Sequence, residues 1–271
     1  MPTPEAALKN FSAAVITGGS SGIGKSFIEL VAKVRPDLAI CNLSRRKPDI
    51  NIPQLNLRHI ACDLSDTAQI GRALGGVSDF LAGAPPGRIL LINNSGFGVY
   101  GRFPEGGIAQ QMEMVDLNIR AVLQLTGGLL PALLARGGVV MTIASTAAFQ
   151  PVPFFATYSA TKSFVLHWSI ALDGELRGTG VRTIAVCPGP TSTEFSKRAG
   201  VKEGLVPDAF SQTSEEVVLA SLRAMAAGKA MVVTGWKNKL LSIVGSRVPK
   251  TLASRIAGAS LAHFRMGRGK P

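Results

Sequence analysis

Two ionisable side chains in this sequence stand at a spacing suited to proton transfer. Tyr158 and Lys162 are four residues apart, and positions i and i+4 lie on the same face of a helix. An ammonium group beside a phenol favours the phenolate, so we expect Lys162 to lower the pKa of Tyr158 from its usual value of about 10. A tyrosine tuned in this way can donate a proton to a carbonyl oxygen or accept one from a hydroxyl group. Ser145, thirteen residues before Tyr158, could hold the same oxygen in place.

A glycine-rich turn near the N-terminus supports a chemical role for these side chains, whose spacing alone could arise by chance. An apolar run at residues 13–16 leads into the turn, and apolar residues at helical spacing follow it between residues 27 and 34. The turn reads Thr17-Gly18-Gly19-Ser20-Ser21-Gly22-Ile23-Gly24. Glycines let a backbone approach a pyrophosphate closely, and the next helix offers free N–H groups and a positive dipole end. We therefore expect a dinucleotide here, although glycines can also serve a tight turn alone.

Further segments resemble the classical short-chain dehydrogenase/reductase family. They follow one another in the family's order over roughly residues 12 to 235: the turn 17–24, Cys62-Asp63-Leu64, Asn93-Asn94-Ser95-Gly96, Asn118, Ser145, Tyr158, Lys162 and Pro188-Gly189. Ser95 stands where the family usually has alanine. The stretch 94–101 is similar to the branch that contains ketoacyl reductases and hydroxysteroid dehydrogenases.

The resemblance implies a role for each matching position. Ser145, Tyr158, Lys162 and Asn118 correspond to the family's catalytic residues. The likeness further implies that Lys162 binds the nicotinamide ribose, and that Asn118 holds a helix irregularity and a water that links Lys162 to solvent. By residue type alone, Asn118 could equally be a buried amide that satisfies backbone groups. The implied cofactor positions are Thr17, Gly18, Ser20, Ser21, Gly22, Ile23, Gly24, Asp63, Leu64, Asn94, Ser95, Gly96, Tyr158, Lys162, Pro188, Gly189, Thr191 and Thr193.

The residues after the second expected strand indicate which dinucleotide binds. An acidic residue at the end of that strand would hold the ribose 2′-hydroxyl of NAD, but Ser44 stands there and Arg45-Arg46-Lys47 follows. Arginines can bind a 2′-phosphate through charge-assisted hydrogen bonds. We therefore predict NADP(H), bound by Ser44, Arg45 and Arg46; the alternative is a solvated basic loop.

The order of segments predicts an α/β fold. Strand-like runs alternate with helix-like segments, as βαβ units require, and continuous apolar strands indicate a parallel sheet covered on both faces. Strands are expected at about 12–17, 38–43, 58–62, 88–93, 138–144, 181–187 and 230–234, and helices at about 22–35, 67–81, 109–135, 157–178 and 214–228. We predict a single Rossmann-type, doubly wound, seven-stranded parallel sheet over residues 1–235, with helices on both faces and the cofactor at the carboxyl ends of the strands.

The cysteines, the histidines and the lack of targeting patterns indicate the cellular compartment and the kind of site to expect. Cys41, Cys62 and Cys187 lie in apolar, strand-like runs and are expected to be buried free thiols in a reducing compartment. The three histidines are far apart in the sequence and predict no metal site. Because neither a signal-peptide pattern nor an uninterrupted apolar run of about 20 residues is present, we expect a cytoplasmic protein.

Basic charge is concentrated in the last fifth of the chain. Residues 217–271 carry ten lysines and arginines and no acidic residue, whereas residues 1–216 are nearly balanced. Apolar residues separate these charges, so residues 236–271 are predicted to form a basic amphipathic helical extension. Such a tail suits an anionic membrane surface or an acyl-type substrate. The alternative is a pair of helices packed on the domain or its partner; a nucleic-acid surface is disfavoured because aromatic residues are few.

Apolar residues near the expected site favour a hydrophobic substrate over a sugar, although some of them could fill the core. They are Phe97, Val99, Tyr100, Phe149, Val152, Phe154 and Phe155. The stretch 190–213 is rich in serine, threonine, proline and charge, and we expect it to be a substrate loop or else an ordinary surface loop.

These observations predict an NADP(H)-dependent oxidoreductase that interconverts a ketone, or ketoacyl group, and a secondary alcohol by hydride transfer. We expect a homo-oligomer that associates through the helices at 109–135 and 157–178, which are apolar on more than one face. Two alternatives stay open: a catalytically silent nucleotide-binding protein on the same scaffold, and a lipid- or membrane-associated protein.

Overall fold

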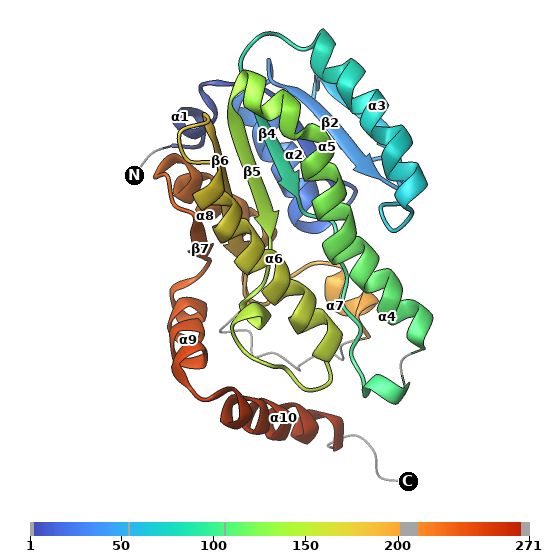
Figure 1. Cartoon of the computed structure of the whole chain (residues 1–271), viewed down its shortest axis with the longest axis vertical. Coiled ribbons are helices and arrows are strands. Elements are labelled where there is room, and N and C mark those ends of the chain that lie inside the picture. The colour runs from blue at the N-terminus through green and yellow to red at the C-terminus, as the bar shows by residue number, and fades with distance from the viewer. Residues whose placement is uncertain (1–2, 54, 106, 201–210, 267–271) are drawn as a thin grey trace.

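A seven-stranded parallel sheet forms the centre of the molecule, in the order β3-β2-β1-β4-β5-β6-β7 (Figure 1). The computed structural model describes residues 3–53, 55–105, 107–200 and 211–266. The strands are β1 (Phe11–Thr17), β2 (Ala39–Ser44), β3 (Leu57–Ala61), β4 (Arg88–Asn93), β5 (Gly138–Ile143), β6 (Val181–Cys187) and β7 (Met231–Val233). Each lies within two residues of its predicted bounds, and the predicted fold class is confirmed.

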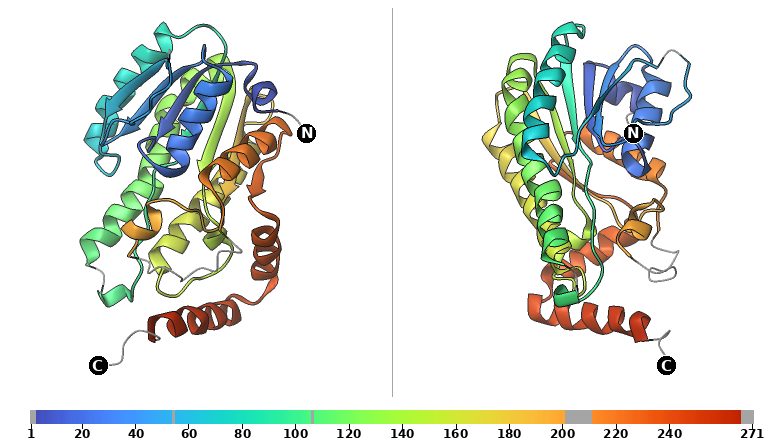
Figure 2. Two further views of the ribbon diagram at one scale, coloured as in Figure 1. Left: turned by 180° about the vertical axis from the view of Figure 1, so that it is seen from behind. Right: turned by 90° about the vertical axis from the view of Figure 1, so that its right-hand side faces the viewer.

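Helices cover both faces of the sheet, as its apolar strands require. They are α1 (Pro4–Leu8), α2 (Gly22–Val34), α3 (Thr67–Gly83), α4 (Ile108–Val115), α5 (Ala121–Arg136), α6 (Ala156–Glu175), α7 (Phe195–Arg198), α8 (Ser214–Ala226), α9 (Trp236–Arg247) and α10 (Lys250–Met266). Helices α1, α2 and α8 share one core cluster, and α3 and α5 share the other, so the two groups pack on opposite faces. Figure 2 shows these layers edge-on.

The carboxyl ends of the strands meet along one edge of the sheet, because all neighbours are parallel. Val15 in β1 lies beside Cys41 of β2 and Leu91 of β4. The strand order reverses direction between β1 and β4. In open parallel sheets, such a switch point opens a crevice at the carboxyl ends, where ligands bind.

The long helical region predicted at 109–135 contains an irregularity. Residues Asp116–Arg120 form a π-helical turn between α4 and α5. The whole stretch Ile108–Arg136 has 29 residues and is long and apolar enough to cross a membrane by length and composition alone. Leu125, Leu129 and Leu133 are nevertheless buried against the sheet, so this is a core helix of the α/β fold.

The chain beyond the sheet forms two helices at one end of the molecule (Figures 1 and 2). Helix α9 begins at Trp236, next to the predicted boundary at residue 235. The predicted substrate loop 190–213 includes α7, but its residues 201–210 lie outside the described part of the chain. Residues 267–271, with the basic Arg268 and Lys270, also lie outside it.

Candidate active site

The structure brings Ser145, Tyr158 and Lys162 together at the carboxyl edge of the sheet. Ser145 follows β5, while Tyr158 and Lys162 lie in the first turns of α6. The Ser145 side chain lies close enough to the Tyr158 hydroxyl to favour its phenolate form. The Nζ atom of Lys162 lies 5.8 Å from the centroid of the Tyr158 ring and donates a 2.8 Å hydrogen bond to the carbonyl of Ile143.

The electrostatics of this cluster differ from the sequence-based expectation. Desolvation raises the pKa of Tyr158 to about 12, and the hydrogen bond from Ser145 only partly opposes it. Desolvation also lowers the pKa of Lys162 to about 8, because this residue is only 5% exposed and charge is costly away from water. The prediction that Lys162 lowers the pKa of Tyr158 is therefore wrong. The cation lies over the ring, where it does little to favour the phenolate.

Asn118 lies in the π-helical turn and connects three elements. Its side-chain oxygen accepts from the Phe97 N–H at 3.1 Å, and its amide donates to the Phe97 carbonyl at 2.9 Å and to Thr161 Oγ1 at 3.0 Å. A Cβ atom on Gly96 would lie 3.0 Å from Asn118 Oδ1 and 3.2 Å from Lys162 Nζ. Asn118 and Lys162 thus approach each other across Gly96, and the expected helix irregularity is present at this residue.

The turn between β1 and α2 has the shape of a phosphate cradle. Gly18 and Gly22 have φ values of +71° and +55°, which favour glycine. A Cβ atom on Gly24 would lie 2.4 Å from the Gly18 carbonyl, so no larger residue fits there. Ser21 precedes α2 without capping it through its side chain, which leaves N–H groups of the first turn available to an anion. These features fit a dinucleotide pyrophosphate.

Polar side chains hold this turn against the neighbouring strands. Thr17 Oγ1 accepts from the backbone N–H groups of Asn94 and Ser95, both at 2.9 Å, and Asn94 Nδ2 donates to the Thr17 carbonyl at 2.9 Å. These bonds join the carboxyl ends of β1 and β4. Leu64, also predicted at the cofactor site, packs its side chain into the core, whereas Ile23 is partly buried against the core.

Asn42 is a positioning residue that the sequence analysis missed. It is fully buried in β2, and its Oδ1 accepts a 2.8 Å hydrogen bond from the N–H of Gly19 in the turn. Its amide nitrogen donates to Ser44 Oγ and also lies 3.0 Å from His59 Nδ1. The available signal was a lone amide within the apolar run of β2, since a buried polar group needs partners.

The residues predicted to bind a 2′-phosphate lie at the carboxyl end of β2. Arg45 is exposed and lies 3.7 Å from the carboxylate of Asp63, a predicted cofactor residue just after β3. Arg46 extends toward Glu194, 3.4 Å away in the loop after β6. The hydroxyl of Ser44 is buried and donates to the Arg46 carbonyl at 2.6 Å. Ser44 therefore shapes the loop, whereas the guanidinium groups are the exposed donors.

The loop after β6 approaches the glycine turn from the other side. A Cβ atom on Gly22 would lie 3.1 Å from a methyl carbon of Thr193, so the Thr193 side chain lies against this glycine. Thr191 Oγ1 donates to the Gly189 carbonyl at 3.0 Å. Gly189, which follows Pro188, lies against the side chain of Asn238 in α9. The extension therefore supports a segment that was predicted to bind the cofactor.

Aromatic side chains form one wall beside Tyr158. Ring centroids are separated by 5.1 Å for Tyr100 and Phe155, 5.7 Å for Phe155 and Tyr158, and 5.3 Å for Tyr158 and Phe195. Phe154 joins the cluster through Tyr100 at 5.9 Å. Tyr100, Phe154 and Phe155 were predicted to contact substrate, whereas Phe195 was missed because nothing in its local sequence marks it.

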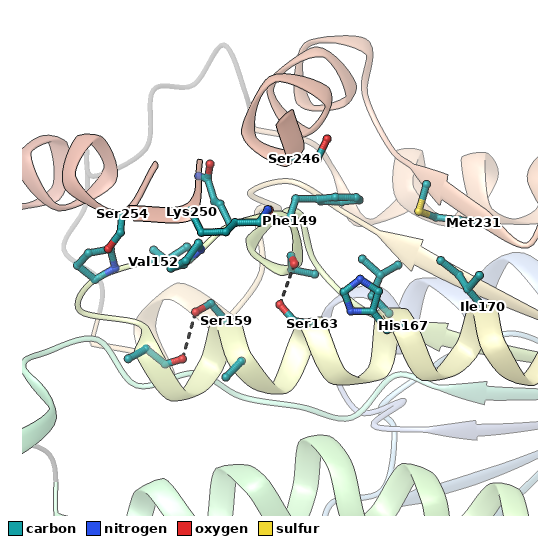
Figure 3. Close-up of a pocket in the computed structure, with 17 residues that line it drawn as sticks. Phe149, Val152, Ser159, Ser163, His167, Ile170, Met231, Ser246, Lys250 and Ser254 are labelled. Carbon is teal, nitrogen blue, oxygen red and sulfur yellow. Dashed lines mark hydrogen bonds between the residues drawn. The ribbon is translucent and has the colours of Figure 1, made fainter. Parts of the chain in front are cut away.

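A separate cavity of about 770 Å³ lies on a neighbouring face of α6 (Figure 3). Its lining includes Phe149 and Val152 but not Ser145, Tyr158 or Lys162. The prediction that Phe149 and Val152 line the same site as the other aromatic residues is therefore wrong. The loop between β5 and α6 turns these two side chains toward α9 and α10. Phe97 is held near the catalytic cluster by its backbone bonds to Asn118, and Val99, in the same loop after β4, is partly buried.

Comparisons with known proteins identify the family to which this fold and this site belong. The family model for short chain dehydrogenases matches residues 12–204. A serine 3-dehydrogenase of Rhizobium radiobacter is 30% identical over 67% of this chain and 73% of its own length. A very-long-chain 3-oxoacyl-CoA reductase of Neurospora crassa is 32% identical over 68% of this chain and 57% of its own length.

Solved structures of short-chain dehydrogenases are also similar to this chain. A short-chain dehydrogenase from Burkholderia cenocepacia in complex with NADP has a TM-score of 0.75 at 24% identity and covers 91% of this chain and 98% of its own. One from Sphingobium yanoikuyae in complex with NADPH has a TM-score of 0.71 at 25% identity, with coverage of 96% and 99%. The chain belongs to the classical short-chain dehydrogenase/reductase family, whose members are oxidoreductases acting on alcohol and ketone groups.

Proposed function

We propose that this protein is an NADP(H)-dependent reductase or dehydrogenase that interconverts a hydrophobic ketone, or a ketoacyl group, and a secondary alcohol. The observation that carries the proposal is the cluster of Ser145 and Tyr158 with the Lys162 ammonium over the Tyr158 ring, beside a glycine turn suited to a dinucleotide. All four expected catalytic positions are present, which argues against a catalytically silent protein on the same scaffold.

Each catalytic side chain has its own role in the direction of reduction. A bound dinucleotide supplies the hydride. Ser145 orients the substrate carbonyl and stabilises the charge that develops on its oxygen, and Tyr158 donates its proton to that oxygen. Lys162 holds the nicotinamide ribose and returns a proton toward Tyr158, while Asn118 fixes the helix turn that keeps Lys162 in place. In the direction of oxidation, Tyr158 accepts the proton of the alcohol.

The exposed arginine at the end of β2 supports NADP(H) over NAD(H). Ser44 stands where an acidic residue would hold a ribose 2′-hydroxyl, and the exposed guanidinium of Arg45 next to it can bind a 2′-phosphate through charge-assisted hydrogen bonds. Neighbouring structures of the family are complexes with NADP and with NADPH, although a 3-ketoacyl reductase of Brucella melitensis is a complex with NADH.

Cofactor preference is tested by measuring kcat/KM with NADPH and NADH for the native protein, Arg45→Gln and the control Lys47→Gln. We expect a preference for NADPH that Arg45→Gln reduces by about tenfold to a hundredfold, because one charge-assisted hydrogen bond contributes about 1.5–3 kcal/mol. Lys47→Gln should change the preference much less. A native preference for NADH would refute this part of the proposal.

The aromatic wall of Tyr100, Phe154, Phe155 and Phe195 supports an apolar substrate. The 3-oxoacyl-CoA reductase among the relatives acts on a long acyl chain by its name, which makes ketoacyl thioesters the first class to test. A screen of NADPH oxidation over ketones, aldehydes and ketoacyl thioesters would identify the substrate. We propose that the protein works in the cytoplasm as a homo-oligomer.

A lipid- or membrane-associated role is the second candidate function. It is favoured by the apolar residues that α9 and α10 expose, and it is compatible with turnover on an apolar substrate.

A further inference from the structure

Helix α9 buries small and polar residues and exposes large apolar ones, which is the reverse of the usual amphipathic arrangement. Asn238, Ser242 and Gly245, spaced four and three residues apart, are its buried residues. Asn238 contacts Gly189, and a Cβ atom on Gly245 would lie 2.5 Å from Gln150 Oε1. A helix on a water-soluble domain normally buries its apolar stripe, so a buried face of small and polar residues means that the apolar stripe is elsewhere.

The apolar stripe of α9 faces outward. Trp236 is 74% exposed, Leu240 57% and Val244 52%, and these positions recur at spacings of four residues. Leu241 and Ile243 flank them and are exposed as well. Contiguous exposed apolar side chains of this kind mark an interaction surface.

Helix α10 continues the same arrangement over the residues whose side chains the structure describes, 250–259. Ala253 is buried and Gly258 lies against Pro153, whereas Leu252 and Ile256 are 48% and 57% exposed. On the inner side, Ser246, Lys250 and Ser254 line the cavity shown in Figure 3. Small and polar residues therefore face the domain from both helices, and the large apolar residues face away from it.

Basic side chains border this outer surface. Lys239, Arg247 and Arg255 are exposed on the two helices, Lys237 lies over the Trp236 ring, and no acidic residue occurs after residue 216. Apolar side chains flanked by lysines and arginines suit an interfacial helix on an anionic bilayer. Each basic residue near such a surface adds about 1 kcal/mol of attraction, and tryptophan favours the headgroup region.

A second copy of the chain fits this surface less well. A symmetric dimer built on it would place the same patch of both copies face to face, so basic residues that border it, such as Lys239 and Arg247, would face a patch that is also basic. Like charges in contact destabilise an interface. A contact with a different surface of the next copy would not close and would build open chains.

We propose that the outer surface of α9 and α10, defined by Trp236, Leu240, Leu241, Val244, Leu252, Lys239, Arg247 and Arg255, docks this protein onto an anionic lipid bilayer. The apolar residues insert at the headgroup boundary while the basic residues contact anionic headgroups. The docking does not depend on hydride transfer, so its test and the test of catalytic activity can fail independently.

The experiment is flotation of the full chain with vesicles of phosphatidylcholine alone and of phosphatidylcholine mixed with phosphatidylglycerol. We expect flotation with the anionic vesicles, little with the neutral ones, and a blue shift of tryptophan emission from Trp236. The double variant Leu240→Ser/Val244→Ser and the double variant Lys239→Glu/Arg247→Glu should each weaken binding by on the order of tenfold or more. All four side chains are exposed, so circular dichroism and thermal unfolding should remain native.

Matched controls are Leu134→Ser on α5 and Lys33→Glu on α2, which change exposed residues elsewhere and should leave flotation unchanged. The proposal is overturned if the native chain does not float with anionic vesicles, or if both double variants float as well as the native chain. It is also overturned if Leu240→Ser/Val244→Ser dissociates a native oligomer in light scattering without changing flotation, which would assign the surface to a second copy.

Discussion

The charge states of Tyr158 and Lys162 set the chemistry at the scale of single residues. Desolvation holds the phenol protonated well above neutral pH and lowers the pKa of the Lys162 ammonium to about 8. Tyr158 is therefore ready to donate a proton at neutral pH, as reduction requires. For oxidation, Tyr158 must lose its proton, which desolvation disfavours.

The pKa of Lys162 has a measurable consequence for stability. Between pH 8 and 10.5 the unfolded chain binds a proton at this lysine that the folded protein has released, because the folded pKa of about 8 lies below the usual 10.5. The free energy of unfolding should therefore rise with pH in this range, by up to about 3 kcal/mol relative to a variant without the group. Urea unfolding of the native protein and Lys162→Met at several pH values checks this. A difference between them that stays constant from pH 7 to 10 would contradict it.

At the scale of elements, local sequence patterns predicted much of the fold. Sequence patterns located every strand of the sheet and the helices between them, because apolar periodicity and glycine turns are local signals. The glycine spacing likewise predicted the turn between β1 and α2, and the i,i+4 spacing predicted that Tyr158 and Lys162 lie close together. Both predictions depend on neighbours within one element.

Other features depend on contacts between distant elements, which cannot be predicted from the local patterns of a single sequence. The hydrogen bond from Gly19 to Asn42 links α2's turn to β2, and Phe195 reaches Tyr158 from a loop far along the chain. The separation of Phe149 from the catalytic side of α6 follows from the path of one loop. The raised pKa of Tyr158 follows from burial, which spacing does not reveal.

Two glycine substitutions, one at the turn between β1 and α2 and one in α3, should have opposite effects. In Gly24→Ala the new methyl group would meet the Gly18 carbonyl at 2.4 Å, so we expect at least a tenfold loss of NADPH affinity and destabilisation by about 1–3 kcal/mol. In Gly71→Ala, within α3, the methyl group meets nothing within 4 Å, and the helix should gain about 0.5–1 kcal/mol. Fluorescence titration with NADPH and urea unfolding measure both effects. Equal behaviour of the two variants would refute the steric account.

At the scale of the whole molecule, two kinds of exposed apolar surface lie on different parts of the fold. One is the outer surface of α9 and α10. The other runs over α4, α5 and α6, where Ile108, Leu123 and Phe164 are exposed. The first is surrounded by basic residues, whereas the second spans helices whose charges include both signs. This difference suits a lipid surface for the first and a second copy of the chain for the second.

The surface of α4 to α6 predicts the oligomeric state. We expect the native protein to be a homodimer or tetramer in light scattering, because apolar residues exposed over packed helices favour self-association. Phe164→Glu should shift the population to smaller species by placing a charge in a desolvated contact. The control is Leu240→Ser on α9, which should leave the oligomer intact. A native monomer at all protein concentrations would contradict the prediction.

Turnover by Tyr158→Phe tests the account most directly, since the substitution removes one oxygen atom and keeps the ring contacts. With NADPH and a reducible ketone or ketoacyl thioester, we predict a loss of kcat on the order of 100- to 10,000-fold, while NADPH affinity stays within a few-fold of native. Tyr100→Phe, at the only other tyrosine, should lose far less. A Tyr158→Phe variant that retains native turnover would contradict the assignment of Tyr158 as the proton donor.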